Sequence, residues 1–151
     1  MAVVLKLVDA RGIQIKGESK VTGHVGEIDV LAWAWGVTAP VGARLDILDM
    51  SIRKSFDLAS PIILEKTANN EILQSGVLTV IDQQGTDMLV VTFKNIKVEA
   101  VSIVEEPKEY PPAERVALRF DEIELKYQGE HVVVRRSATL GRRKTIARRK
   151  R

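Results

Sequence analysis

Apolar and polar residues alternate along much of the chain with the two-residue period of β-strands. A first strand is predicted over residues 2–8, and a second over residues 27–35, which are rich in residue types that favour strands. Residues 45–52 predict another strand, in which the apolar spacing slips by one residue between Ile47 and Met50. This first part of the chain therefore predicts β-structure.

The second half of the chain continues the same pattern. Residues 77–81 and 88–93 flank a Gln84-Gly85 turn, which is the arrangement of a β-hairpin. Residues 98–104 and 115–127 alternate again, with a change of apolar parity near Asp121. Between these two segments lies a proline-rich loop.

A single short helix interrupts the strands. Ser60 suits the N-cap and Pro61 the first helical position, and Asn69-Asn70 would end a helix of about ten residues. Many strands with one short helix predict a mainly β fold, an antiparallel barrel or sandwich.

The charge of the chain is divided unevenly. The net charge is +3, but residues 135–151 contain nine of the 23 basic residues and none of the 20 acidic ones. Residues 1–134 therefore carry a net charge of −6. We predict a folded domain over 1–134 and a basic, disordered tail over 135–151.

The tail permits three interpretations. It is a solvated segment without a role, it contacts the acidic domain of a neighbouring subunit or ring, or it binds nucleic acid or an anionic membrane. The residues that would bind anions or a neighbouring ring are Arg142, Arg143, Lys144, Arg148 and Arg149.

Candidate catalytic chemistry is sparse. The chain has no cysteine, which excludes disulfides and thiolate sites, and its two histidines, His24 and His131, lie far apart in sequence. Glu27 and Asp29 share a strand face, but solvated strand ends often carry such pairs. We find neither a nucleophile elbow nor a phosphate-binding loop. We therefore expect no enzyme, no metal and no cofactor, and keep a hydrolase using the two acids as a weak alternative.

The strand over residues 27–35 has two different faces. Trp33 and Trp35 share one face and would anchor the barrel core, although exposed rings could also stack on bases or sugars. Ala32 and Ala34 then share the opposite face, a smooth uncharged strip that either packs against a neighbour or faces a wide pore or partner.

Nothing in the chain predicts a secretory signal or a membrane span. The short apolar run at the N-terminus is interrupted by Lys6 and followed at once by Asp9 and Arg11. A protein of this kind would leave the cell only by a route that needs no cleavable signal.

A series of motifs occurs in a specific order along the chain. They are Lys16-Gly17-Glu18-Ser19, His24, Gly26-Glu27-Ile28-Asp29-Val30-Leu31-Ala32-Trp33-Ala34-Trp35-Gly36, Ser60-Pro61, Val77-Leu78-Thr79, Glu114-Arg115-Val116-Ala117-Leu118-Arg119-Phe120, Ile123, Leu125 and Tyr127. In order and spacing these motifs resemble the Hcp (hemolysin-coregulated protein) family, most closely over residues 15–36. The resemblance covers roughly residues 3–130 and leaves the basic tail outside.

The resemblance implies an antiparallel β-barrel with one helix, similar to the tail-tube proteins of contractile phages. It implies hexameric rings that stack into the hollow inner tube of a type VI secretion system, exported when the sheath contracts. The implied partners are further copies of the chain, sheath and spike proteins, and effectors carried in the lumen, for which Ala32 and Ala34 are the lumen-facing candidates. The implied location is the bacterial cytoplasm before firing, then the medium or a target cell. The alternative is a monomeric β-barrel that binds nucleic acid through its basic tail.

Overall fold

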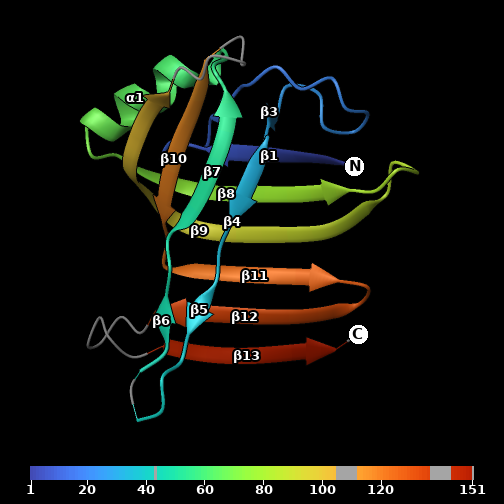
Figure 1. The fold of residues 1–151 in the computed structure, drawn as a ribbon, viewed down its shortest axis with the longest axis vertical. Helices are drawn as coiled ribbons and strands as arrows, with labels where there is room; N and C mark the ends of the chain where they lie inside the picture. Colours follow the sequence, from blue (N-terminus) through green and yellow to red (C-terminus); the bar gives the residue numbers. More distant parts are fainter. Residues whose placement is uncertain (43, 105–111, 137–143, 151) are drawn as a thin grey trace.

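The computed structural model describes residues 1–42, 44–104, 112–136 and 144–150 (Figure 1). Within these ranges the chain is mostly antiparallel β-sheet with a single helix packed at one end. The elements are β1 (Ala2–Val8), β2 (Gln14–Ile15), β3 (Ile28–Asp29), β4 (Ala32–Ala34), β5 (Val37–Thr38), β6 (Asp46–Ile47), β7 (Met50–Ser55), α1 (Ala59–Ala68), β8 (Ile72–Ile81), β9 (Asp87–Val104), β10 (Ala113–Arg119), β11 (Glu122–Tyr127), β12 (Glu130–Arg136) and β13 (Lys144–Lys150).

The strand pairings form a circuit that returns to its starting strand. β1 pairs with β8, β8 with β9, β9 with β10, β10 with β7 and β7 with β4, all antiparallel. The chain between β3 and β4 completes the circuit, because β3 pairs with β1. Val30 N–H donates to Val3 O at 2.9 Å, and Leu31 N–H donates to Arg53 O at 2.8 Å. The predicted antiparallel β-barrel is thereby confirmed.

One segment predicted as a single strand is therefore two. Residues 27–35 form β3 and β4, because the chain changes partners between Val30 and Leu31. The slip expected between Ile47 and Met50 is also present, since β6 ends at Ile47 and β7 begins at Met50. The parity change near Asp121 separates β10 from β11.

Two segments predicted as separate strands form one long strand, β9. Its first part pairs with β8 and β11, and its last part pairs with β10. Asn95 lies between them with φ 55°, a left-handed conformation that asparagine tolerates better than most residues. A register shift opposite Ala117 and Leu118 adds a bulge. β9 therefore bends without ending and belongs to both sides of the barrel (Figure 1).

The sheet continues beyond β9 through three further strands. β11 pairs with β9, β12 with β11, and β13 with β12, so that the C-terminal strands lie side by side (Figure 1). β12 extends to Arg136, past the predicted boundary at Val134, and Lys144–Lys150 pairs along the whole of β12 where the charge density predicts a free tail. The antiparallel backbone pairing with β12 gives this segment the ordered partner that a solvated tail would not have. The division into a domain over 1–134 and a tail over 135–151 stays a prediction.

The helix matches the predicted length but begins differently. α1 has ten residues and ends at Ala68, with Asn69 as its C-cap, as expected. Its N-cap is Leu58, not Ser60, so the predicted cap is wrong. The Ser60 hydroxyl instead lies within hydrogen-bonding distance of Lys54 Nζ at 2.9 Å and Glu114 Oε1 at 3.0 Å. Leu58 N–H donates to Glu18 Oε2 at 2.8 Å, which ties the helix start to the Gly17-Glu18-Ser19 segment.

The interior of the barrel is apolar. Phe93 and Phe120 lie at its centre, fully buried, with ring centroids 5.5 Å apart. Trp33 and Trp35 are half-buried and pack against this core, and the Trp35 ring lies 6.2 Å from that of Phe120. Trp35 Nε1 also donates to Leu48 O at 2.9 Å, which anchors the chain beyond the β5–β6 pair to the barrel.

Candidate assembly and cargo surface

Ala32 and Ala34 lie on an exposed face of the barrel. In β4 both alanines are exposed and Trp33 between them is half-buried, which is the alternation that the sequence predicts. The assignment of these alanines to a lumen stays a prediction, because it depends on an assembly of several copies.

The strand register extends this face across four strands. Ala32 is the partner of Arg53 in β7, which is the partner of Arg115 in β10, which in turn is the partner of Ser102 in β9. The adjacent row on the same side consists of small residues. It runs from Ala34 through Ser51 and Ala117 to Ala100.

We call these eight residues the alanine–arginine face. Six of them are alanine or serine, so the two arginine side chains provide its charge. A shallow pocket of about 260 Å³ opens on it. Ala32, Trp33, Ala34, Ser51, Arg53 and Arg115 line this pocket, and no carboxylate is among these described residues.

A second polar cluster lies where β7, β10 and the start of α1 meet. Lys54 is buried, and its Nζ lies 2.7 Å from Glu114 Oε1 and 2.8 Å from Asp57 Oδ1. Ser60 bridges the cluster, and Asp57 Oδ1 accepts from Ala59 N–H at 3.0 Å. This cluster fixes α1 against the barrel.

The third feature is His24, which joins two loops at one end of the barrel. Its Nδ1 lies 3.0 Å from Glu27 Oε2 and its Nε2 lies 3.0 Å from Asp87 Oδ1. Burial of the imidazole opposes its protonation, but the hydrogen bonds to Asp87 and Glu27 outweigh burial and raise the pKa of His24 above its ordinary value. His24 therefore holds the loop before β3 against the start of β9.

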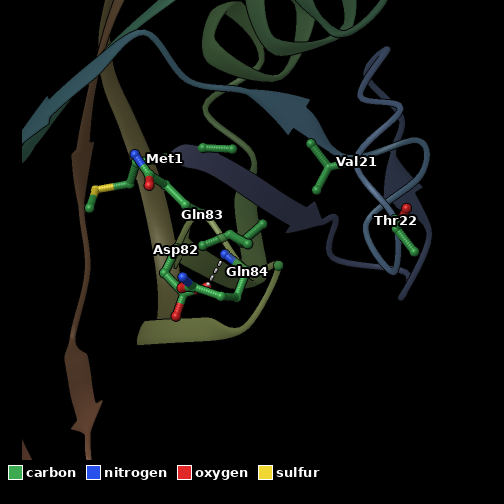
Figure 2. Close-up of a pocket in the computed structure, with 9 residues that line it drawn as sticks. Met1, Val21, Thr22, Asp82, Gln83 and Gln84 are labelled. Carbon is green, nitrogen blue, oxygen red and sulfur yellow. Dashed lines mark hydrogen bonds between the residues drawn. The ribbon is translucent and has the colours of Figure 1, made fainter.

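An open pocket of about 660 Å³ lies near this end of the barrel (Figure 2). Figure 2 shows Asp82, Gln83 and Gln84 of the β8–β9 turn on one side with Met1, and Val21 and Thr22 on the other. Gln84 N–H and Thr86 N–H both donate to Asp82 Oδ1 at 2.9 Å, so this carboxylate is used in shaping the turn. The pocket therefore lies between loops, and its lining residues do not include a set of catalytic side chains that point toward one another.

The other predicted site residues do not form a catalytic centre. Glu27 is held by His24, while Asp29 is exposed. His131 lies in β12, and its Nδ1 is 3.1 Å from Glu124 Oε2 in β11. It therefore has a different partner from His24, which lies in the loop before β3. Within the described ranges no group of three or more histidine, aspartate or glutamate side chains could hold a metal ion.

Three of the five predicted tail residues, Lys144, Arg148 and Arg149, lie in the last strand. In β13 the backbone register pairs Lys144 with Arg136, Arg148 with Val132 and Arg149 with His131. Arg142 and Arg143 fall outside the described residues. Any role of these five residues in binding anions or another ring stays a prediction.

The sequence analysis missed Arg53 and Arg115 as site residues. Within β7, Arg53 is two residues from Ser51, and within β10, Arg115 is two residues from Ala117, so alternation alone indicates that each arginine shares a strand face with a small residue. What the sequence could not give is the register that places the two side chains opposite each other.

The architecture is that of an antiparallel β-barrel with exposed sheet faces, and the described residues bring together no cluster of catalytic groups. The chain belongs to the Hcp family: the family model described as "Type VI secretion system effector, Hcp" matches residues 5–127. Hcp proteins are secreted, tube-forming components of type VI secretion systems, and the family is not one of enzymes.

Relatives and solved structures agree with this family. Protein hcp1 of Pseudomonas aeruginosa is 29% identical over 126 residues, covering 76% of this chain and 78% of that protein. The structure of Hcp1 from the E. coli EAEC 042 pathovar matches with a TM-score of 0.79 and 23% identity over 99% of this chain and 97% of that one. Hcp1 from Salmonella typhimurium matches with a TM-score of 0.74 and 24% identity over 96% and 100%.

These two solved structures share the fold over 99% and 96% of this chain. The similarity in fold therefore extends beyond residues 3–130, the approximate range over which the sequence resembles the family. None of the described helices is long and apolar enough to cross a membrane.

Proposed function

We propose that this protein is the ring subunit of a type VI secretion inner tube. Copies assemble into hexameric rings, the rings stack into a hollow tube, and effector proteins travel in the lumen. The observation that carries this proposal is the membership of the Hcp family over residues 5–127. The sheath and spike proteins of the same machine are its further partners.

The barrel offers suitable joining surfaces. Within the described residues β13 pairs only with β12, and β4 pairs only with β7, so each leaves one strand edge without a partner in the monomer. Such edges are surfaces for joining another chain, and a cyclic ring covers them without open ends. This supports assembly through the sides of the barrel.

The proposed lumen surface is the side that carries Ala32 and Ala34. Small side chains on a continuous four-strand face would leave the channel wide. The protein is then a carrier that acts without catalysis. It is made in the bacterial cytoplasm and leaves it when the sheath contracts.

The mass of the particle in solution tests the assembly. We expect native mass spectrometry to give the mass of a hexamer and electron micrographs to show rings. Single molecules at concentrations where rings ought to persist would refute the proposal, and steeply salt-dependent binding of such monomers to DNA would support the nucleic-acid alternative instead.

Ala34→Glu tests the orientation of the face. We expect hexamers of unchanged mass and a change in the amount of effector that is bound or exported. Ala68→Glu, on the exposed end of α1, is the matched control. Failure of rings to form in the Ala34 variant alone would show that position 34 is a packing site between subunits.

A further inference from the structure

The β5–β6 hairpin is a small two-stranded sheet that joins the barrel at its base. Val37 pairs with Ile47 and Thr38 with Asp46, and these pairs form a sheet apart from the eleven-stranded one. Figure 1 shows the hairpin at the lower end of the molecule. An isolated two-stranded hairpin is marginally stable at best in water. The orientation of this hairpin therefore depends on the contacts at its base.

Arg136, the last residue of β12, makes one of these contacts. Its Nη2 donates to Ile47 O at 3.3 Å, and its Nε donates to Phe120 O at 3.0 Å. Its backbone N–H donates to Asp121 O at 2.8 Å. Phe120 is fully buried in the core, in the connection between β10 and β11. The guanidinium group therefore links the hairpin to the centre of the barrel.

The carbonyl that Arg136 binds lies on the outer edge of β6. Leu48 N–H donates to Gly36 O at 3.1 Å, so Leu48 directs its N–H toward the β5 side. Successive residues of a strand direct their backbone groups to opposite sides, and Ile47 therefore directs its carbonyl away from β5. Arg136 supplies the donor that such an edge carbonyl otherwise takes from water or from another strand.

The hydrogen bond from Trp35 Nε1 to Leu48 O is a second attachment of the same segment. Trp35 and Arg136 thus hold the carbonyls of two successive residues, Leu48 and Ile47. A single hydrogen bond would leave the hairpin free to pivot about it. Two attachments at neighbouring residues define one orientation.

Arginine suits this position because the guanidinium group has several N–H donors in a fixed plane. Two different N–H groups of Arg136 can therefore bind two carbonyls at once, which a lysine ammonium does with less defined geometry. Burial and the nearby Arg119 lower the pKa of Arg136, and three carboxylates act against this, namely Asp49, Asp121 and Asp46. A guanidinium group in a protein stays protonated, so both hydrogen bonds are charge-assisted.

The hairpin that Arg136 holds carries exposed apolar side chains. Val41 is fully exposed, and Val37 and Leu48 are 41% and 42% exposed. In a stack of rings, an element at one end of the molecule is placed to meet a second copy of the chain. A surface that is already held in its bound orientation loses less conformational entropy when it binds.

We propose that Arg136 is a positioning residue, which holds the β5–β6 hairpin in one orientation on the barrel and so presets the surface that a second copy of the chain meets when rings stack. Only the last step of this inference rests on the proposed function, because the attachment of the hairpin concerns a single copy. The last strands of the chain then serve stacking through a side chain as well as through their edges.

Spin labels measure the orientation of the hairpin. The chain has no cysteine, so Thr38→Cys in β5 and Lys6→Cys in β1 provide two specific labelling sites, both exposed. Labelled protein is mixed with an excess of unlabelled protein, so that the measured distances lie within one copy. We expect double electron–electron resonance to give one narrow distance distribution. Arg136→Gln should lose it and give a broad one, with shorter tubes and hexamers of unchanged mass.

Two variants control this measurement. Arg135→Gln removes the same charge from the adjacent residue of β12, and Arg135 Nε lies 2.6 Å from Glu122 Oε1, in an ion pair that does not involve the hairpin. We expect its distance distribution and tube length to be unchanged. Arg136→Lys keeps the charge but loses the planar fork, so we expect a distribution of intermediate width. It also serves as the test if thermal unfolding shows that Arg136→Gln does not fold.

The outcomes separate the attachment of the hairpin from the assembly of rings. A narrow distribution in Arg136→Gln, or equal broadening in both glutamine variants, would overturn the positioning role. Broadening with tubes of unchanged length would overturn the role of the held hairpin in stacking. Wild-type protein that stays monomeric would refute the proposed function, and the distance distributions of those monomers would still decide whether Arg136 holds the hairpin.

Discussion

The Nζ atom of Lys54 lies 2.7 Å from Oε1 of Glu114, and both side chains are only 1% exposed. The two residues are partners in the β7–β10 pair and point to the inner side of the sheet. Arg53 and Arg115, the next residues along the same strands, are partners on the outer side. Adjacent positions of one strand pair therefore carry a structural ion pair inside and a like-charged pair outside.

Lys54→Met should destabilise the protein by about 3–5 kcal/mol, because it leaves the buried Glu114 carboxylate without its cation. The double variant Lys54→Met/Glu114→Gln should recover most of this loss, since the glutamine is neutral and still accepts from Ser60. Urea unfolding of both variants measures the difference. Equal stability of the single and double variants would contradict the explanation by an uncompensated Glu114 carboxylate.

His24 should make the stability depend on pH. Its pKa is raised in the folded state by Asp87 and Glu27 against the opposing effect of burial, so the protonated form stabilises the fold. This contribution is fully present below the ordinary histidine pKa of 6.5 and is lost as the pH rises through the higher folded value.

Thermal unfolding from mildly acidic to mildly alkaline pH checks this expectation. Wild-type protein should lose stability over that range relative to His24→Gln, in which the titrating group is absent. Asp87→Asn should reduce the dependence without abolishing it, because Glu27 remains. Parallel pH profiles of the wild type and the glutamine variant would contradict the role of His24.

Gly17→Ala should destabilise the loop before β3. Gly17 N–H donates to Gly26 O at 2.9 Å, and a Cβ at this position would lie 2.7 Å from Glu27 O and 2.8 Å from Ile28 Cα. Because both atoms belong to the backbone, we expect a loss of about 1–3 kcal/mol. Gly36→Ala is the control, since a Cβ there meets no atom within 4 Å. A matching change in unfolding free energy for both variants would reject the steric explanation.

Removal of residues 137–151 tests the C-terminal strand. β12 would lose its partner β13, so we expect shorter tubes in electron micrographs and a lower melting temperature. Replacement of Arg142, Arg143, Lys144, Arg148 and Arg149 by glutamine keeps the chain length and removes the charge.

The comparison of these two variants distinguishes the contribution of the β13 backbone from that of its charged side chains. Short tubes only in the truncated protein would assign the effect to the strand, and short tubes in both would assign it to contacts of the charged side chains between rings. Loss of binding to DNA or anionic vesicles, with tubes unchanged in both, would instead support a role of the basic side chains in anion binding.

Much of the fold follows from local patterns in the sequence. Alternation predicts β1 and the β8–β9 hairpin, and the parity changes near Ile47 and Asp121 mark breaks that the structure contains. The residues that the sequence could not place depend on partners far away in the chain. Ser60 is a good N-cap by residue type, yet the buried Lys54 and Glu114 draw its hydroxyl into their cluster.

The same reasoning explains the candidate site. Alternation is enough to put Ala32 and Ala34 on one face and Trp33 on the other. Only the pairing of β7 with both β4 and β10 brings Arg53 and Arg115 beside them. The charged part of the surface is therefore a property of strand register, which a single sequence does not encode locally.

The circuit of strands that closes through residues 28–34 has a consequence for the order of folding on the ribosome. Ile28 in β3 can pair with Leu5 in β1 as soon as the first segment has emerged, but β7 acquires its second neighbour, β10, only after Arg119 has been synthesised. Contacts of such long sequence separation form slowly. Most of the interior must therefore stay exposed to water until the last third of the polypeptide is available, and nascent chains of this protein should depend on protection from aggregation during that interval.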